Sequence, residues 1–271
     1  MNEIVIILCT YENDTLEQFT EMFESLNQQT FKKFDIFVQQ DGKIDNKLED
    51  YLDYLKAIHK ISYLGKRDLN KGFAYSLNEL IKIIMMKEQY KYIVRMDSDD
   101  ICVADRIFLQ YSFMQENQNI DVCGGLIEEF NMDTNEKQII NYPENSKDIL
   151  NNMYKRNSVA HVSAFFRKSY FEKVGLYDVS KLNEDYDLWI RGFENSCNFY
   201  NLQTVLVKVR TNNAFFNRRK NIKRAKEVMY LKFKLTKLFS FGLKGYIYAI
   251  AHFILFMSPG IIKQFIYKYF R

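Results

Sequence analysis

The sequence has few of the residues that mark disordered or disulfide-rich chains. Only two prolines occur among its 271 residues, Pro143 and Pro259, which argues against a disordered or linker-rich protein. Its four cysteines form no C-x-x-C pair, so neither a cysteine-based zinc site nor a dense disulfide framework is expected. The first residues lack a basic segment and a small-residue cleavage site, and we expect a strand there rather than a signal peptide. Free thiols in a reducing cytosol are the simplest interpretation.

No stretch of the chain strongly favours a membrane span. The most apolar one, Tyr246–Ile262, has about 17 residues, which is the lower limit for crossing a bilayer, and Pro259-Gly260 would interrupt a helix there. Positive charge is concentrated around it. Residues 215–271 hold thirteen Lys and Arg but a single acid, Glu227, so they carry a net charge of +12 and leave −8 for residues 1–214. Such asymmetry favours a surface-binding appendage on a separate first domain, residues 1–214.

We expect residues 215–271 to be helical and to lie on the cytoplasmic face of a membrane. The basic residues between Arg218 and Lys226 would attract anionic lipid headgroups, and the apolar stretch would enter the interface. The alternatives are a soluble helical cap on the first domain and a homodimer interface. Nucleic-acid binding is not expected, because no recognised binding module accompanies the basic run.

The first hundred residues alternate short apolar runs with stretches of helical periodicity. Strands are predicted at Ile4–Cys9, Phe34–Val38, Ile61–Leu64 and Tyr92–Met96. Helices are predicted at Leu16–Asn27, Leu48–His59 and Gly72–Met86. This order is typical of an α/β domain with a mostly parallel sheet. Later elements are less regular, with helices expected at Asp105–Asn117, Ser169–Val174, Asp185–Asn195 and Arg218–Lys237 and strands at Val122–Phe130 and Thr204–Val209.

Polar residues follow three of the predicted strands. Thr10-Tyr11 comes after the first, Asp41 after the second and Asp97-Ser98-Asp99-Asp100 after the fourth. Ligands of open α/β sheets bind beyond the carboxyl ends of strands, so these residues should share one site. Two carboxylates two residues apart suit Mg²⁺ or Mn²⁺, which prefer oxygen ligands. For a D-x-D taken alone, the alternative is a solvated acidic turn that caps the helix near Asp105.

Six segments, taken in order, resemble family 2 glycosyltransferases of the GT-A fold, a Rossmann-like α/β architecture with a mostly parallel central sheet flanked by helices. They are Ile4–Asn13, Ser25–Phe31, Val38–Gly42, Asn70–Gly72, Asp97–Asp100 with Asp105-Arg106, and Asn183–Arg191. The resemblance covers about residues 3–210. The Glu-Asp-Tyr-Asp-Leu-Trp sequence at 184–189 is similar to single-transfer enzymes that build bacterial polysaccharide and lipopolysaccharide. The Gln-x-x-Arg-Trp motif of the processive enzymes is not found.

This resemblance implies a metal-dependent, inverting enzyme that uses a UDP-sugar. Tyr11 would lie against the uracil ring and Asp41 would accept its N–H. Asp97 would hold the ribose or sugar side, and Asp99, with Asp97, would bind Mn²⁺ or Mg²⁺. The chain departs from the family where Leu77 precedes Asn78, a place where an arginine is frequent. The nucleotide-sugar site is therefore predicted to comprise Thr10, Tyr11, Asp41, Lys71, Asp97 and Ser98.

The resemblance also implies that Asp185 is the base that takes a proton from the acceptor hydroxyl. His161, Glu184 and Trp189 are candidates for the acceptor side. Each has a plainer alternative: acids at a helix start favour the helix dipole, a lone histidine is usually structural, and Trp189 at helical spacing suits a core. The implied reaction is hexosyl or N-acetylhexosaminyl transfer to a lipid-linked, lipopolysaccharide or capsule acceptor. A protein or soluble glycan acceptor, or a nucleotide-sugar-binding protein without transfer activity, are the alternatives.

Overall fold

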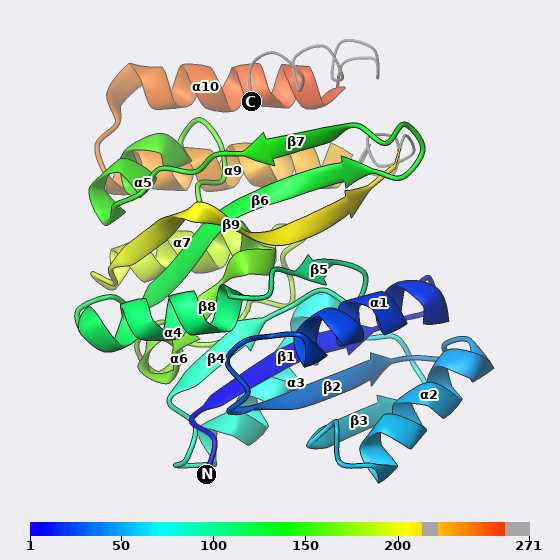
Figure 1. Ribbon diagram of the computed structural model, residues 1–271. Helices are drawn as coiled ribbons and strands as arrows, with labels where there is room; N and C mark the ends of the chain where they lie inside the picture. The colour runs from blue at the N-terminus through cyan, green and yellow to red at the C-terminus, as the bar shows by residue number, and fades with distance from the viewer. Residues whose placement is uncertain (213–221, 258–271) are drawn as a thin grey trace.

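The computed structural model describes residues 1–212 and 222–257, which are built around a nine-stranded mixed sheet flanked by helices (Figure 1). The strand order is β3-β2-β1-β4-β8-β6-β9-β5, with β7 paired to β6. The strands are β1 (Ile4–Thr10), β2 (Phe34–Asp41), β3 (Tyr63–Arg67), β4 (Tyr92–Arg95), β5 (Ile101–Cys102), β6 (Val122–Asn131), β7 (Lys137–Ile140), β8 (Phe165–Arg167) and β9 (Phe199–Thr211).

The first half of the sheet is parallel, because β1 pairs with both β2 and β4, and β2 pairs with β3, in the same direction. Successive side chains of β1 point to opposite faces of the sheet. Ile4 and Ile6 enter one core cluster, while Val5 and Ile7 enter the other. A strand covered on both faces needs apolar residues throughout, which explains the unbroken apolar run at this place in the sequence.

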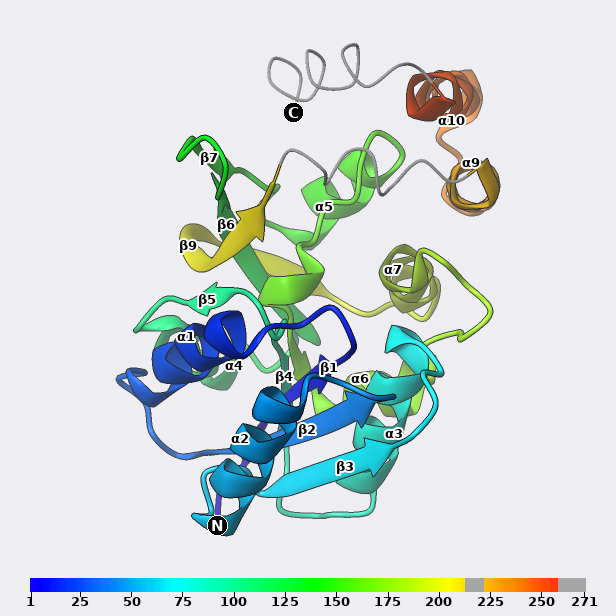
Figure 2. The same ribbon diagram turned by 90° about the vertical axis from the view of Figure 1, so that its right-hand side faces the viewer.

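Helices cover both faces of the sheet, as Figure 2 shows from the side. One face carries α1 (Leu16–Asn27), α2 (Asn46–Ala57) and α4 (Arg106–Glu116). The opposite face carries α3 (Phe73–Met85), α5 (Ser146–Met153), α6 (Lys168–Val174) and α7 (Glu184–Glu194). Loops that leave the carboxyl ends of β1, β2 and β4 therefore open between these two layers. The predicted α/β fold with a mostly parallel sheet is confirmed.

The second half of the sheet mixes directions. β6 and β9 are parallel, but β8 is antiparallel to β4 and β6, β5 is antiparallel to β9, and β7 is antiparallel to β6. β5, β7, β8 and α5 were not predicted from the sequence. β5 and β8 have two and three residues, too few for alternation to be visible, and three of the four side chains of β7 are exposed.

Two helices follow the sheet, α9 (Ile222–Leu238) and α10 (Gly242–Met257), and they pack together as a hairpin beside α7 (Figure 2). α9 buries Leu231 and Leu235 in the same cluster as the core side of α7. α10 buries only Gly245 and Ala249. The predicted basic helix is confirmed from Ile222 onward; Arg218 to Asn221, and residues 258–262 of the apolar stretch, lie outside the described residues. None of the helices in 1–212 and 222–257 is both long and apolar enough to cross a bilayer.

Gly192 of α7 is a position where any side chain would disturb the core. A Cβ built there would lie 2.6 Å from Oη of Tyr170 and 2.7 Å from Cζ of Phe199. We expect Gly192→Ala to lower the free energy of unfolding by roughly 1–3 kcal/mol through overpacking, although Gly-to-Ala changes inside helices usually stabilise. Urea denaturation measures this, with Lys82→Ala on the exposed side of α3 as the control. A stabilised Gly192→Ala protein would contradict the packing described.

Candidate active site

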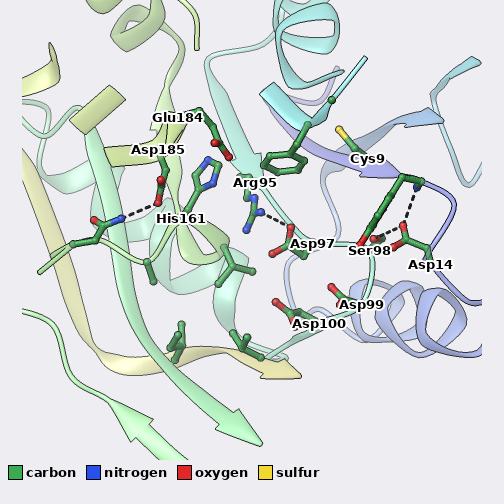
Figure 3. A pocket seen from close by; sticks show the side chains of 18 of the residues that line it. Cys9, Asp14, Arg95, Asp97, Ser98, Asp99, Asp100, His161, Glu184 and Asp185 are labelled. Atoms are coloured by element: carbon green, nitrogen blue, oxygen red, sulfur yellow. Dashed lines mark hydrogen bonds and ion pairs between the residues drawn. The ribbon is translucent and has the colours of Figure 1, made fainter. Parts of the chain in front are cut away.

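A cleft of about 940 Å³ opens at the carboxyl ends of β1 and β4. The last residue of β2 and the loops after β1, β3 and β4 line one side of it, and the start of α7, residues between 156 and 162, and Arg224 of α9 line the other. Figure 3 shows Asp14, Asp97, Asp99 and Asp100 on one side and Glu184 and Asp185 on the other, with Arg95 and His161 between them. Parallel strands explain this convergence, because their carboxyl ends meet at one edge of the sheet.

The loop after β4 holds a compact carboxylate cluster. Ligand oxygens of Asp97, Asp99 and Asp100 all lie within 4.8 Å of one another. Burial, reinforced by the charges of the neighbouring carboxylates, raises the pKa of Asp99 to about 6 and that of Asp100 well above its usual value. The backbone amide of Arg210 donates to Asp100 at 2.9 Å. Three crowded carboxylates are a donor set that a hard divalent cation fits, because its charge would relieve their mutual repulsion.

Asp14 joins the loop after β1 to the carboxylate cluster. Its Oδ2 accepts hydrogen bonds from Ser98 Oγ at 2.7 Å and from the Tyr11 amide at 3.1 Å. Burial raises the pKa of Asp14 to about 7, and the charges of Asp99 and Asp97 add to this effect. Asp14 was not predicted as a site residue, because an acid two positions before a helix resembles any polar loop residue.

Arg95 is a buried cation between the two acidic sides of the cleft. It is 5% exposed, forms an ion pair with Asp97, and its guanidinium lies 5.0 Å from the centre of the Phe73 ring. Arg95 was not predicted as a site residue, although an arginine at the end of the otherwise apolar strand β4, directly before the acidic motif, was a usable signal. Next to it, His161 Nε2 lies 2.8 Å from Oη of Tyr177. Burial and the Arg95 charge hold the pKa of His161 well below its usual value, so its ring is neutral.

The residues predicted for the nucleotide lie on the β1 and β2 side. Thr10 is fully buried, while Tyr11 is 41% exposed at the rim of the cleft. Asp41 accepts hydrogen bonds from the amides of Lys71 at 2.7 Å and Gly72 at 2.9 Å, and from Nε of Arg67 at 2.8 Å. Burial alone would raise the pKa of Asp41, but these bonds outweigh burial and lower it, so the group is a carboxylate.

Asp185 lies at the start of α7 on the opposite side. Its Oδ2 accepts a hydrogen bond of 2.8 Å from the side-chain amide of Asn157, which fixes how the carboxylate is turned. Burial, with the charge of Asp185 as a second cause, raises the pKa of the adjacent Glu184 to about 7. Trp189 is fully buried one turn further along α7, with its ring centre 5.9 Å from that of His161.

The cleft therefore brings together most of the candidates predicted from the sequence: Thr10, Tyr11, Asp41, Asp97, Ser98, Asp99, His161, Glu184 and Asp185. Two others do not line it. Lys71 extends its Nζ over the Tyr75 ring, 4.8 Å from its centre, and presents only its backbone to Asp41. Trp189 stacks on Phe166 in the core behind His161. Asn157, which no motif indicates, is a functional candidate found only from the structure.

Comparison with known proteins identifies related sequences. The family described as "Glycosyl transferase family 2" matches residues 5–175. The chain is 27% identical over 220 residues to an Escherichia coli protein named UDP-Gal:alpha-D-GlcNAc-diphosphoundecaprenol beta-1,3-galactosyltransferase, covering 81% of this chain and 78% of that one. It is 25% identical over 264 residues to the amylovoran biosynthesis glycosyltransferase AmsE of Erwinia amylovora, covering 97% of each chain.

A solved structure shares the fold. TarS of S. aureus, residues 1–349, in complex with UDP-GlcNAc superposes with a TM-score of 0.61 at 16% sequence identity. The match covers 97% of this chain and 83% of that one. At this level of identity the likeness establishes the GT-A fold alone, and it agrees with the sheet order and the helical layers described above.

The raised pKa of Glu184 predicts a pH-dependent loss of stability. Its folded-state pKa of about 7 lies above the usual value of 4.5, so the folded protein holds the proton more tightly and loses relative stability as pH rises between these values. Glu184→Gln removes this loss. We expect its gain in unfolding free energy over the wild type to be larger at pH 8 than at pH 5, by roughly 1–3 kcal/mol.

Urea denaturation at both pH values measures this difference. Glu172→Gln, on the exposed side of α6, is the control and should show no such pH dependence. Equal gains for Glu184→Gln at pH 5 and pH 8 would contradict the shift.

Proposed function

The chain belongs to glycosyl transferase family 2, and we propose that it is a metal-dependent, inverting glycosyltransferase that moves a hexosyl or N-acetylhexosaminyl unit from a UDP-sugar to a lipid-linked or other cell-surface polysaccharide acceptor. One observation carries the proposal. The carboxylate cluster of Asp97, Asp99 and Asp100 and the carboxylate of Asp185 face each other across a single cleft (Figure 3). One side suits a charged diphosphate with its counterion, and the other suits an acceptor hydroxyl.

The donor would occupy the β1 and β2 side of the cleft. Tyr11 at the rim offers an aromatic face on which a uracil ring can stack. The carboxylate oxygens of Asp41 already accept protein N–H groups but retain lone pairs for a further donor such as the uracil N–H. The TarS neighbour, with the same fold, is a complex with UDP-GlcNAc, which supports a uridine nucleotide.

Mg²⁺ or Mn²⁺ would be held by Asp99 and Asp97, with Asp100 beside them. When bound, the cation supplies positive charge that stabilises the diphosphate as it leaves. The chain itself prepares this place in two ways. Arg95 holds Asp97 by an ion pair, and Ser98 is fixed to Asp14, so the loop between β4 and β5 cannot turn freely.

Asp185 would act as the base. The acceptor hydroxyl gives its proton to the free oxygen of Asp185, and its oxygen forms the new bond to the anomeric carbon while the bond from that carbon to the UDP oxygen breaks. Attack from the face opposite the diphosphate inverts the configuration. Asn157 donates to Asp185 Oδ2 and thereby leaves the other oxygen, Oδ1, for the acceptor. The neutral ring of His161 lies beside this path and can order a sugar hydroxyl through a hydrogen bond.

The acceptor side of the cleft contains positive charge that suits a phosphorylated acceptor. Arg156 and Arg224 line the cleft together with Asp185 and Asn157. The E. coli relative is named for transfer to a diphosphoundecaprenol-linked sugar. We infer a lipid-linked acceptor on these two grounds. To reach such an acceptor, the enzyme would have to act at a membrane surface.

The hairpin of α9 and α10 offers a surface for that membrane. Leu243, Ile247, Ile250 and Ile254 follow one another at helical spacing along α10 and are 76%, 56%, 47% and 64% exposed. Lys223 and Lys226 of α9 are also exposed and add positive charge to the same hairpin. We infer peripheral attachment to the cytoplasmic leaflet through an interfacial helix.

Replacing the base separates catalysis from donor binding. We expect Asp185→Asn to lower transfer, and donor hydrolysis, by at least about 10²-fold, because a positioned base contributes roughly 10²–10⁴-fold. UDP binding in the presence of Mn²⁺ should stay within about twofold of the wild type. The measurement is UDP release from a panel of UDP-sugars with Mn²⁺ or Mg²⁺, with and without chelator, alongside calorimetric titration of UDP.

The results of these measurements distinguish between the proposed transferase and its alternatives. Unchanged turnover in Asp185→Asn would remove the base assignment. A wild type that binds UDP yet turns over no donor, even with a diphosphopolyprenol-linked sugar as acceptor, would favour a binding protein without transfer activity. Turnover that survives the chelator would remove the metal from the proposal.

Membrane attachment is tested on α10. We expect the wild type to co-sediment with phosphatidylglycerol-containing vesicles, and Ile247→Glu to weaken binding roughly 10-fold or more, because burying one such side chain stabilises by about 1.5–3 kcal/mol. Phe108→Glu, which alters an equally exposed apolar side chain on α4, is the control and should bind as the wild type does. A wild type that ignores vesicles but forms a dimer, which Ile247→Glu dissociates, would assign the stripe to a second copy instead.

A further inference from the structure

The start of α7, which carries Asp185, lacks a side-chain cap of its own. Asn183 at the N-cap position makes no capping hydrogen bond to the amides of the first turn. Helix starts leave several amides without partners inside the helix, and they need acceptors from elsewhere. The segment before α7 therefore depends on contacts from outside the helix to fix its position.

α9 supplies these contacts through Glu227. Its Oε1 accepts hydrogen bonds from the backbone amides of Leu182 at 2.9 Å and Asn183 at 2.8 Å, and from Nδ2 of Asn183 at 3.0 Å. One turn away on α9, Arg224 donates to the Leu182 carbonyl from Nε at 3.1 Å and from Nη2 at 2.7 Å. Glu227 is the single acid of residues 215–271, and it is placed where the amides preceding Asp185 need an acceptor.

α9 makes a second contact, this one buried, with the turn that leads to Asn157, the hydrogen-bond partner of Asp185. Lys232 is 2% exposed, and its Nζ donates to the carbonyls of Tyr154 at 3.0 Å and Lys155 at 2.6 Å. These carbonyls lie just after α5, two and three residues before Asn157, whose amide binds Asp185. Burial lowers the pKa of Lys232 to about 7. Enclosing an amine is costly, and the hydrogen bonds to the two carbonyls offset part of that cost.

These contacts converge on one carboxylate from two directions. Resting on the proposed role of Asp185 as base, we propose that Glu227 and Lys232 of α9 are positioning residues for catalysis, which hold the two chain segments that orient Asp185 toward the acceptor. Glu227 fixes the peptide that leads into Asp185, and Lys232 fixes the turn that leads to Asn157. Glu227 and Lys232 thus support the acceptor side of the site without lining the cleft themselves.

α9 also contacts α7 far from Asp185, and this contact provides a control variant. Lys234 lies 3.5 Å from Glu194, at the far end of α7 from Asp185. Like Lys232 it is a lysine of α9, but its partner is a carboxylate at the C-terminal end of α7. Removing it should loosen α9 on α7 without moving the base.

The experiment compares Lys232→Met, Glu227→Leu and Lys234→Met in the full chain. We expect the first two to lower kcat by about 10–100-fold, since small displacements of a catalytic group cost this much, with KM for the donor within about threefold of the wild type. UDP affinity with Mn²⁺ should not change, because donor and metal bind on the other side of the cleft. Lys234→Met should keep kcat within about twofold. Glu227→Gln, which keeps an acceptor oxygen, should restore most of the activity that Glu227→Leu loses.

Hydrogen exchange provides a readout that does not depend on turnover. Amides of residues 182–187 should exchange faster in Glu227→Leu, and those of residues 154–157 faster in Lys232→Met, whereas neither segment should change in Lys234→Met. Wild-type kcat in both α9 variants, or a loss of UDP affinity in proportion to kcat, would overturn the inference. If Asp185→Asn is inactive while the α9 variants are fully active, the inference fails and the proposed function stands. If the wild type transfers no sugar, the proposed function fails, and exchange alone decides whether α9 anchors these segments.

Discussion

The guanidinium of Arg95 is the point on which the cleft depends. It is buried at the carboxyl end of β4, beneath a loop that gathers several carboxylates, and it pairs with Asp97. The backbone of Arg95 is also bonded on both sides. Its amide donates to the carbonyl of Ala164 at 3.0 Å, and its carbonyl accepts from Nη2 of the fully buried Arg106 at 2.8 Å. The guanidinium contacts Asp97 of the loop after β4 and the ring of Phe73 at the start of α3, while the backbone of Arg95 is bonded to α4 and to the turn before β8. Arg95 therefore links these elements to the acidic loop.

The carboxylates around it are crowded at the expense of stability. Burial, together with neighbouring negative charge, raises the pKa values of Asp14 and Glu184 to about 7 and of Asp99 to about 6. Structural ion pairs alone would not require so many acids in one cleft. The arrangement is consistent with the proposed function, in which a cation would arrive with the donor on one side and a proton would be taken up on the other.

Much of the fold and of the cleft could be predicted from the sequence because both depend on local patterns. Unbroken apolar runs such as Ile4–Cys9 indicate strands covered on two faces, and the polar residues that follow them must meet at one edge of the sheet. Asp14 and Asn157 were missed because their roles arise from long-range contacts, whereas Arg95 pairs with Asp97 only two positions away and had a local signal, a charge at the end of an apolar strand. Ser98 is 84 positions from Asp14, and Asp185 is 28 from Asn157. Lys71 and Trp189 show the converse: each follows a motif in sequence, yet the fold turns the Lys71 side chain toward Tyr75 and encloses Trp189 in the core.

The change of charge near residue 215 indicates a boundary between a catalytic domain and an appendage, but the packing of α9 continues across it. Leu231 and Leu235 belong to the same core cluster as Leu188, and Glu227 serves as the acceptor that α7 does not provide for itself. A region joined in this way is not an interchangeable module. An exchange of C-terminal regions between relatives would also replace the side chains that pack on α7 and bond to the segment before it, so such hybrids would have to be matched at the α7 interface.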